Sequence, residues 1–149
     1  MKLHYRLSLA ISILFLLLSF AADPSMAQVS KPGEYSGYSS ILYSETVRTS
    51  QYVTTRDGTK LAVDILRPAK GGVVVNTPYP VLWIYNWGGR TMNGRHAVDN
   101  YADTVKHGYV VAFADARGTG ASYGAMIGSY TRTEAYDAYD LTEWLGTQP

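Results

Sequence analysis

The stretch that decides the fold is YVVAFADARGTGASYG, residues 109–124. Its first part, Tyr109–Asp115, is an apolar run of the kind that forms a strand buried on both faces of a parallel sheet. A second such run, PVLWIYN, occupies residues 80–86. Between the two, residues 96–108 read HAVDNYADTVKHG, with apolar residues at helical spacing and Gly108 where a helix C-terminal cap belongs. Strand, helix and strand in this order predict a parallel strand pair joined by a crossover helix.

A hairpin precedes this core and a helix follows it. Asp57-Gly58 is a two-residue turn signal, because glycine accepts a positive φ without steric cost. Apolar residues alternate in the strand after the turn, and Pro68 is expected to end that strand. Thr131 and Glu134 form a capping-box signal for the helix that follows. The apolar face of that helix would consist of Ala135, Ala138, Leu141 and Leu145. The predicted fold class is α/β: a hairpin, then strand, helix, strand and helix.

The loop at residues 120–124, GASYG, matches the G-x-S-x-G pattern of a nucleophile elbow. An elbow needs a strand that runs directly into the motif and a helix that begins at the serine. Here the strand ends near Asp115 and the next helix signal is at Thr131, so we predict that Ser122 is a loop residue. A self-contained site of Ser122, a histidine and an aspartate stays as an alternative. The loop also lacks the third glycine of a dinucleotide fingerprint, since Tyr123 stands there.

Composition narrows the function further. The chain has 149 residues, 46% of them hydrophobic and 17% charged, which predicts one globular domain. A net charge of +1 gives no basic surface for a nucleic acid. The absence of cysteine excludes a disulfide framework, a thiolate metal site and a cysteine nucleophile. We therefore expect no nucleic-acid partner, no metal and no cofactor, and we predict no particular oligomeric state.

The N-terminus has the pattern of an export signal. Lys2 and Arg6 precede the apolar run Leu7–Ala22, and Ser25-Met26-Ala27 supplies a small-x-small cleavage site. A membrane-spanning helix is the alternative, but the run is shorter than the roughly 20 residues that a bilayer needs. Residues 1–27 are thus predicted to be a signal peptide that leaves an exported, periplasmic or secreted, protein with no stable membrane anchor. Residues 28–48, rich in Ser, Gly and Tyr, are predicted to be an extended lead-in.

Three stretches together resemble the cocaine-esterase and Xaa-Pro dipeptidyl-peptidase (CocE/NonD, S15-like) family of α/β-hydrolases. TRDGTKLAVDILRP, residues 55–68, resembles the hairpin that opens these enzymes. HGYVVAFADARGTGASYG, residues 107–124, resembles their D-x-RG-x-G-x-S-x-G strand and loop, and EAYDAYDLTEWLGTQP, residues 134–149, resembles their EWL-x-x-QP helix. The resemblance implies that residues 49–149 are the N-terminal portion of an α/β-hydrolase domain, with the sheet incomplete.

The same resemblance implies a function for the whole protein. In the family the catalytic serine lies in a G-x-S-Y-x-G elbow beyond the EWL-x-x-QP helix, so no catalytic residue is expected in this chain. The chain would be the front of an exported serine hydrolase that cleaves a small-molecule ester or an Xaa-Pro peptide through an acyl-serine intermediate. Alone it would be inactive. The alternative is a complete small exported α/β domain that binds without catalysis.

Two loops are the candidates for support of that chemistry. One oxyanion-hole donor in α/β-hydrolases comes from the loop that here follows Asn86. In the family a tyrosine supplies it, but Gly88 occupies that position, so the candidates are the N–H groups of Gly88 and Gly89 or the hydroxyl of Tyr85. Trp87 is a substrate-pocket candidate; a plain tight turn and a core tryptophan are the alternatives. In the second loop we predict structural roles for Asp115, Arg117, Gly118 and Gly120.

Overall fold

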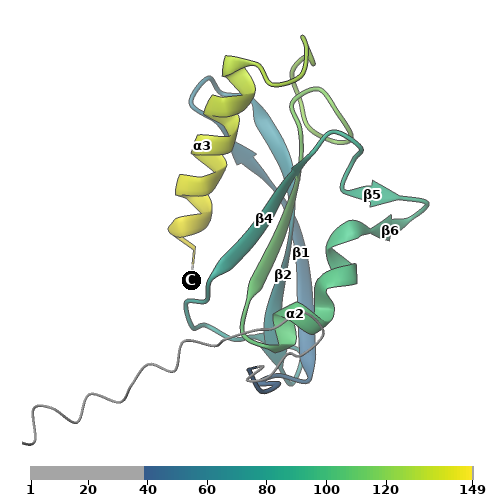
Figure 1. Cartoon of the computed structure of the whole chain (residues 1–149), viewed down its shortest axis with the longest axis vertical. Helices are drawn as coiled ribbons and strands as arrows, with labels where there is room; N and C mark the ends of the chain where they lie inside the picture. The colour runs from purple at the N-terminus through teal and green to yellow at the C-terminus, as the bar shows by residue number, and fades with distance from the viewer. Residues whose placement is uncertain (1–38, 149) are drawn as a thin grey trace, which may run out of the picture. The chain divides into compact units, whose positions relative to one another are not determined.

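The computed structural model describes residues 39–148 (Figure 1). The predicted signal peptide and the first part of the predicted lead-in lie outside the described residues. The elements are β1 (Glu45–Thr54), β2 (Lys60–Lys70), β3 (Val73–Val74), β4 (Val81–Asn86), β5 (Thr91–Met92), β6 (Arg95–His96), the 3-10 helix η1 (Ala97–Tyr101), α2 (Ala102–Lys106), β7 (Val110–Asp115) and α3 (Arg132–Gly146). Within residues 39–148, no helix combines the length and the apolar character needed to cross a bilayer.

The main sheet has the strand order β1-β2-β7-β4, with β3 beside β2 (Figure 1). β1 and β2 form the predicted antiparallel hairpin around Asp57-Gly58, and β2 also pairs antiparallel with β7. β4 and β7 pair in parallel from Val81 opposite Val110 to Asn86 opposite Asp115. The predicted parallel pair is therefore confirmed, and so is its crossover, formed by η1 and α2.

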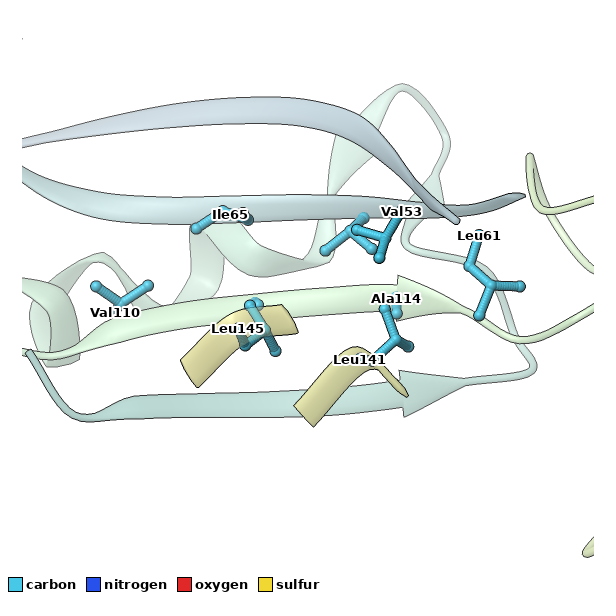
Figure 2. Close-up of a cluster of buried hydrophobic side chains, with 9 residues drawn as sticks. Val53, Leu61, Ile65, Val110, Ala114, Leu141 and Leu145 are labelled. Atoms are coloured by element: carbon cyan, nitrogen blue, oxygen red, sulfur yellow. The ribbon is translucent and has the colours of Figure 1, made fainter. Parts of the chain in front are cut away.

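Helices cover both faces of the sheet. Alternate residues of β7 point to opposite sides, and because all of them are buried, each side needs a helix to cover it. Val110, Ala112 and Ala114 pack in one cluster with Leu141 and Leu145 of α3, which Figure 2 shows lying over β7. The intervening Val111 and Phe113 pack in a second cluster with η1 and α2. Thr131 caps α3 with the predicted capping box, in which Glu134 is the partner. This layered arrangement confirms the α/β class.

Three sequence predictions about strands need correction. β1 begins at Glu45, so it takes in the last residues of the stretch interpreted as a lead-in. Pro68 does not end β2, which continues to Lys70. The Pro68 carbonyl accepts a 2.9 Å hydrogen bond from the Val75 N–H, so its ring nitrogen faces the β3 side. Proline has no N–H to donate. At Pro68 the absent donor would point to the β3 side, just beyond the last β2–β3 pair, so no hydrogen bond to β1 or β7 is lost.

The β4 strand is not buried on both faces, as its apolar sequence predicted. Leu82 and Ile84 are 48% and 36% exposed, because β4 is the last strand of the sheet in the described part of the chain and η1 and α2 cover β7 and β2 instead. Trp83, on the opposite face, packs against the α3 cluster.

Candidate functional site

Ser122 holds the loop between β7 and α3 to the sheet. Its Oγ donates to the Asp115 carbonyl at 2.7 Å and accepts from the Ala62 N–H at 2.9 Å. The two histidines of the described residues are engaged elsewhere: His96 Nδ1 with Asp64, and His107 Nδ1 with the Ser40 carbonyl. Ser122 is therefore a loop residue, and neither of these histidines is hydrogen-bonded to it.

The replacement Ser122→Ala is expected to lower the free energy of unfolding by about 1–2 kcal/mol, because it leaves the Ala62 N–H without its acceptor in a part-buried position. Urea unfolding followed by tryptophan fluorescence measures the loss. The exposed Ser44→Ala is the control and should change stability by less than about 0.5 kcal/mol. Equal stabilities for the two variants would contradict the structural role of Ser122.

Asp115 organises two loops from the end of β7. Its side chain is buried, and its Oδ2 accepts from the Ala121 N–H at 2.9 Å while its Oδ1 accepts from the Arg90 N–H. Gly120 has φ +52°, and a Cβ there would overlap the Asp115 carboxylate. The close approach of Gly120 thus lets the loop wrap around the carboxylate.

Arg117 joins the same loop to α3 and to the β1–β2 turn. Its Nη2 lies 2.6 Å from Asp137 Oδ1 and its Nε donates to Asp137 Oδ2 at 2.9 Å, while Nη1 lies 2.8 Å from Asp57. Asp137 is thus the partner of Arg117 on α3. The hydrogen bonds to Asp137 raise the pKa of Arg117. The hydrogen bond from Arg117 is in turn the largest of the causes that lower the pKa of Asp57.

Tyr85 is less suited to an oxyanion hole than the glycines. Its hydroxyl donates to Asp137 Oδ2 at 3.2 Å and accepts from the Arg117 N–H at 3.1 Å. Burial, aided by the Asp137 charge, raises the pKa of Tyr85 to about 12. The hydroxyl proton of Tyr85 is therefore already donated to Asp137 of α3 and cannot also be donated to an oxyanion.

The two glycines differ in their hydrogen bonds. The Gly88 N–H donates to the Asn86 side-chain oxygen at 2.9 Å, and the Asn86 amide in turn donates to the Gly89 carbonyl at 2.8 Å. Gly89 has φ +85°, and the hydrogen bonds among the described residues include none from its N–H. Gly89 is thus the strongest oxyanion-donor candidate of the three.

Trp87 lines a cavity of about 390 Å³ at the carboxyl end of β4, here called the aromatic cavity. Its walls are Tyr85, Trp87, Tyr130, Thr131, Glu134 and Ala135. The Trp87 indole N–H donates to Glu134 Oε1 at 2.6 Å, and its ring meets the Tyr130 ring edge to face at 4.9 Å. The sequence identified Trp87 as a residue that lines a pocket, but it did not identify Tyr130. It identified Glu134 only as part of a helix cap.

A buried charge cluster that the sequence reasoning missed lies on the other face of the sheet. Asp64, in β2, is fully buried and meets Ser50, Arg90 and His96. Burial raises the pKa of Asp64, but the bonds from His96, Ser50 and Arg90 outweigh it and hold that pKa below its usual value. The β5–β6 hairpin, which turns at Asn93 (φ 50°) and Gly94 (φ 74°), supplies His96, and Arg90 directly precedes this hairpin. Asn-Gly is a strong hairpin signal, so this element could have been predicted.

Arg90 also lies 3.4 Å from Asp115, so one guanidinium links the loop after β4 to both buried aspartates. Within residues 39–148, no three His, Asp or Glu side chains gather in a group that could hold a metal ion. The site is thus a set of loops fixed by ion pairs at the carboxyl ends of β4 and β7.

A mixed sheet with a parallel β4–β7 pair, helices on both faces and loops fixed at the carboxyl strand ends defines the N-terminal part of an α/β-hydrolase fold. The chain belongs to the X-Pro dipeptidyl-peptidase (S15) family, which matches residues 57–149. It is 33% identical over 104 residues to the cocaine esterase of Rhodococcus sp. strain MB1 Bresler, covering 67% of this chain and 17% of that protein.

Solved structures show the same fold. A CocE/NonD family hydrolase from Staphylococcus aureus matches with a TM-score of 0.56 and 23% identity over 69% of this chain and 21% of its own. A post-proline cleaving enzyme from Rickettsia typhi matches with a TM-score of 0.51 and 23% identity, covering 69% of this chain and 15% of its own. The chain spans a fifth or less of the length of the curated relatives it matches.

Proposed function

We propose that this chain supplies the N-terminal part of an exported serine hydrolase that cleaves acyl ester or Xaa-Pro peptide bonds through an acyl-serine intermediate. The family of the chain supports the reaction class, and the pattern of residues 1–27 supports export. The catalytic serine would lie in an elbow that follows α3, in sequence beyond Pro149.

The observation that carries the proposal is the placement of the two helices. The crossover from β4 to β7 runs over one face of the sheet through η1 and α2, whereas α3 packs on the other face. Crossovers between parallel strands are right-handed, so a crossover on the opposite face must lead in the opposite direction. A parallel strand after α3 would therefore lie past β4 and pair with the outer edge of β4.

That position would bring a nucleophile elbow to the loop Asn86–Arg90. The elbow sits at the carboxyl end of its strand, and one oxyanion donor comes from the loop of the neighbouring strand. The Gly89 N–H is available at this end of β4, and one such donor is worth about 3 kcal/mol in the transition state. Arg90, held by Asp64 and Asp115, fixes the loop in place.

The first test reads the gene past the codon for Pro149 and labels the gene product with a fluorophosphonate. We expect an open frame that leads into a G-x-S-Y-x-G turn, and labelling of the full product at that serine. Residues 28–149 alone should not be labelled, because the nucleophile and its histidine are absent from them.

The matched variant is Ser122→Ala in the full product, which should still be labelled because the Ser122 hydroxyl is bound to the sheet. Loss of labelling in this variant would overturn the proposal in favour of a self-contained site. A stop codon after Pro149 with no labelling would instead favour a binding domain. Chromogenic acyl esters and Xaa-Pro amides then decide between the two kinds of bond.

A further inference from the structure

Glu134 is a buried carboxylate without a cationic partner. Four carboxylates are buried among residues 39–148: Asp64, Asp115, Glu134 and Asp137. The three aspartates each form an ion pair with Arg90 or Arg117. Glu134, 8% exposed, has no Lys, Arg or His nitrogen of the described residues within ion-pair distance. Because buried carboxylates are rarely left unpaired, this one points to a cation other than those of the described residues.

The hydrogen bonds of Glu134 fix its carboxylate without neutralising it. Oε1 accepts from the Trp87 indole N–H at 2.6 Å, and Oε2 accepts from the Thr131 N–H at 2.9 Å in the capping box. The N-terminus of α3 adds a partial positive charge, which stabilises the carboxylate in part. The remaining negative charge lies in the wall of the aromatic cavity.

The other walls of the aromatic cavity suit a cation as well. Tyr85, Trp87 and Tyr130 present three aromatic rings around a volume of about 390 Å³. The Trp87 and Tyr130 rings stand at 88° to each other with centroids 4.9 Å apart. Aromatic faces attract cations through the ring quadrupole, and aromatic side chains recognise organic ammonium groups in this way.

Tyr130 adopts a conformation that packing does not explain. Its φ is 60°, in the left-handed region that residues other than glycine rarely adopt, yet the residue is 87% exposed. Burial of Tyr130 therefore does little to offset the energetic cost of the strained backbone. The conformation does place the Tyr130 ring in contact with Trp87. Backbone strain of this kind clusters at ligand-binding positions.

We propose that the aromatic cavity binds a small organic cation, with the ammonium group against Glu134 and the faces of Trp87 and Tyr130. The cavity lies at the carboxyl end of β4, the edge at which open α/β sheets bind ligands. The site goes beyond the proposed hydrolase activity: it shares Trp87 with the substrate-pocket candidate, but neither Gly88 nor Gly89 lines it.

The test compares choline with 3,3-dimethylbutan-1-ol, a neutral molecule of the same shape, by calorimetric titration of the protein produced from its own gene. We expect choline to bind and the neutral molecule to bind at least about tenfold more weakly, since only choline meets the carboxylate and the ring faces as a cation. Glu134→Gln should weaken choline about tenfold. Glutamine also serves at this position of a capping box, so the helix is kept.

Tyr130→Gly separates binding from folding. Glycine accepts φ 60° without strain, so the midpoint of thermal unfolding should stay the same or rise, while choline binding weakens because one wall is lost. Equal binding of choline and its neutral isostere, no binding of either, or unchanged choline binding in both variants would overturn the proposal. Fluorophosphonate labelling is read separately, so failure of the cation site and failure of the hydrolase are distinguished.

Discussion

Replacement of Arg117 by methionine is expected to lower the free energy of unfolding by about 3–5 kcal/mol. The reason is Asp137, which is 1% exposed and receives two bonds from the Arg117 guanidinium. Without Arg117 the carboxylate stays buried with the Tyr85 hydroxyl as its remaining donor, at 3.2 Å. A buried charge that loses its partner carries its full desolvation cost. Urea unfolding followed by tryptophan fluorescence measures the change.

The exposed ion pair of Arg56 and Asp140 gives the matched control for this prediction. Arg56 Nη2 lies 2.7 Å from Asp140, and the guanidinium also lies over the Tyr136 and Tyr139 rings, all near the surface. Arg56→Met should therefore lower the free energy of unfolding far less than Arg117→Met does.

A second replacement tests the cause of the Arg117 effect. Adding Asp137→Leu to Arg117→Met removes the unpaired charge and should restore much of the stability, because buried ion pairs are often replaceable by apolar residues. A loss below about 1 kcal/mol in Arg117→Met, or no recovery in the double variant, would contradict this account.

The sequence predicted the parts of the fold that local signals determine. Asp57-Gly58 forms the hairpin turn, Thr131 and Glu134 cap α3, and the apolar runs form the parallel β4–β7 pair. These signals act within a few residues or through a simple alternation, so one stretch of chain is enough to recognise each of them.

The polar contacts of the site could not be predicted in the same way. Asp64 interrupts an apolar strand. Its burial is possible because Arg90, from the loop after β4, and His96, from the β5–β6 hairpin, both contact it. Glu134 and Trp87 are likewise 47 positions apart in the sequence. Such partners depend on where loops cross the sheet edge, which no local pattern records.

The loop after β7 depends on Gly118, and Gly118→Ala is expected to lower the free energy of unfolding by about 3 kcal/mol or more. Gly118 has φ +69°, and a Cβ there would overlap the Met126 nitrogen and lie 2.7 Å from the Ala125 carbonyl carbon. The obstructing atoms are backbone, so no side-chain rotation relieves the overlap. The conformational strain and the overlap each cost about 1–3 kcal/mol.

Relief of that overlap would open the loop and break the contacts that hold it to the sheet. The Gly118 N–H donates to the Tyr123 carbonyl at 3.0 Å, and the Tyr123 N–H donates to the Lys60 carbonyl of β2 at 2.9 Å. A shift of Gly118 away from Met126 would therefore displace Tyr123 and weaken its hydrogen bonds. It would also displace the neighbouring Ser122, whose hydroxyl donates to the Asp115 carbonyl. A small substitution in the loop is thus transmitted to the ends of β2 and β7.

Gly71→Ala is the control that separates strain from overlap. Gly71 has φ +60°, close to that of Gly118, but nothing lies within 4 Å of the position of its Cβ. Its replacement should cost about 1 kcal/mol, the cost of the left-handed conformation alone. The difference between the two variants in urea unfolding then measures the close approach of Gly118 to Met126. If Gly118→Ala lowered the free energy of unfolding no more than Gly71→Ala does, the loop would not be tightly packed at Gly118. The inference that this loop rigidly supports the strand ends would then be wrong.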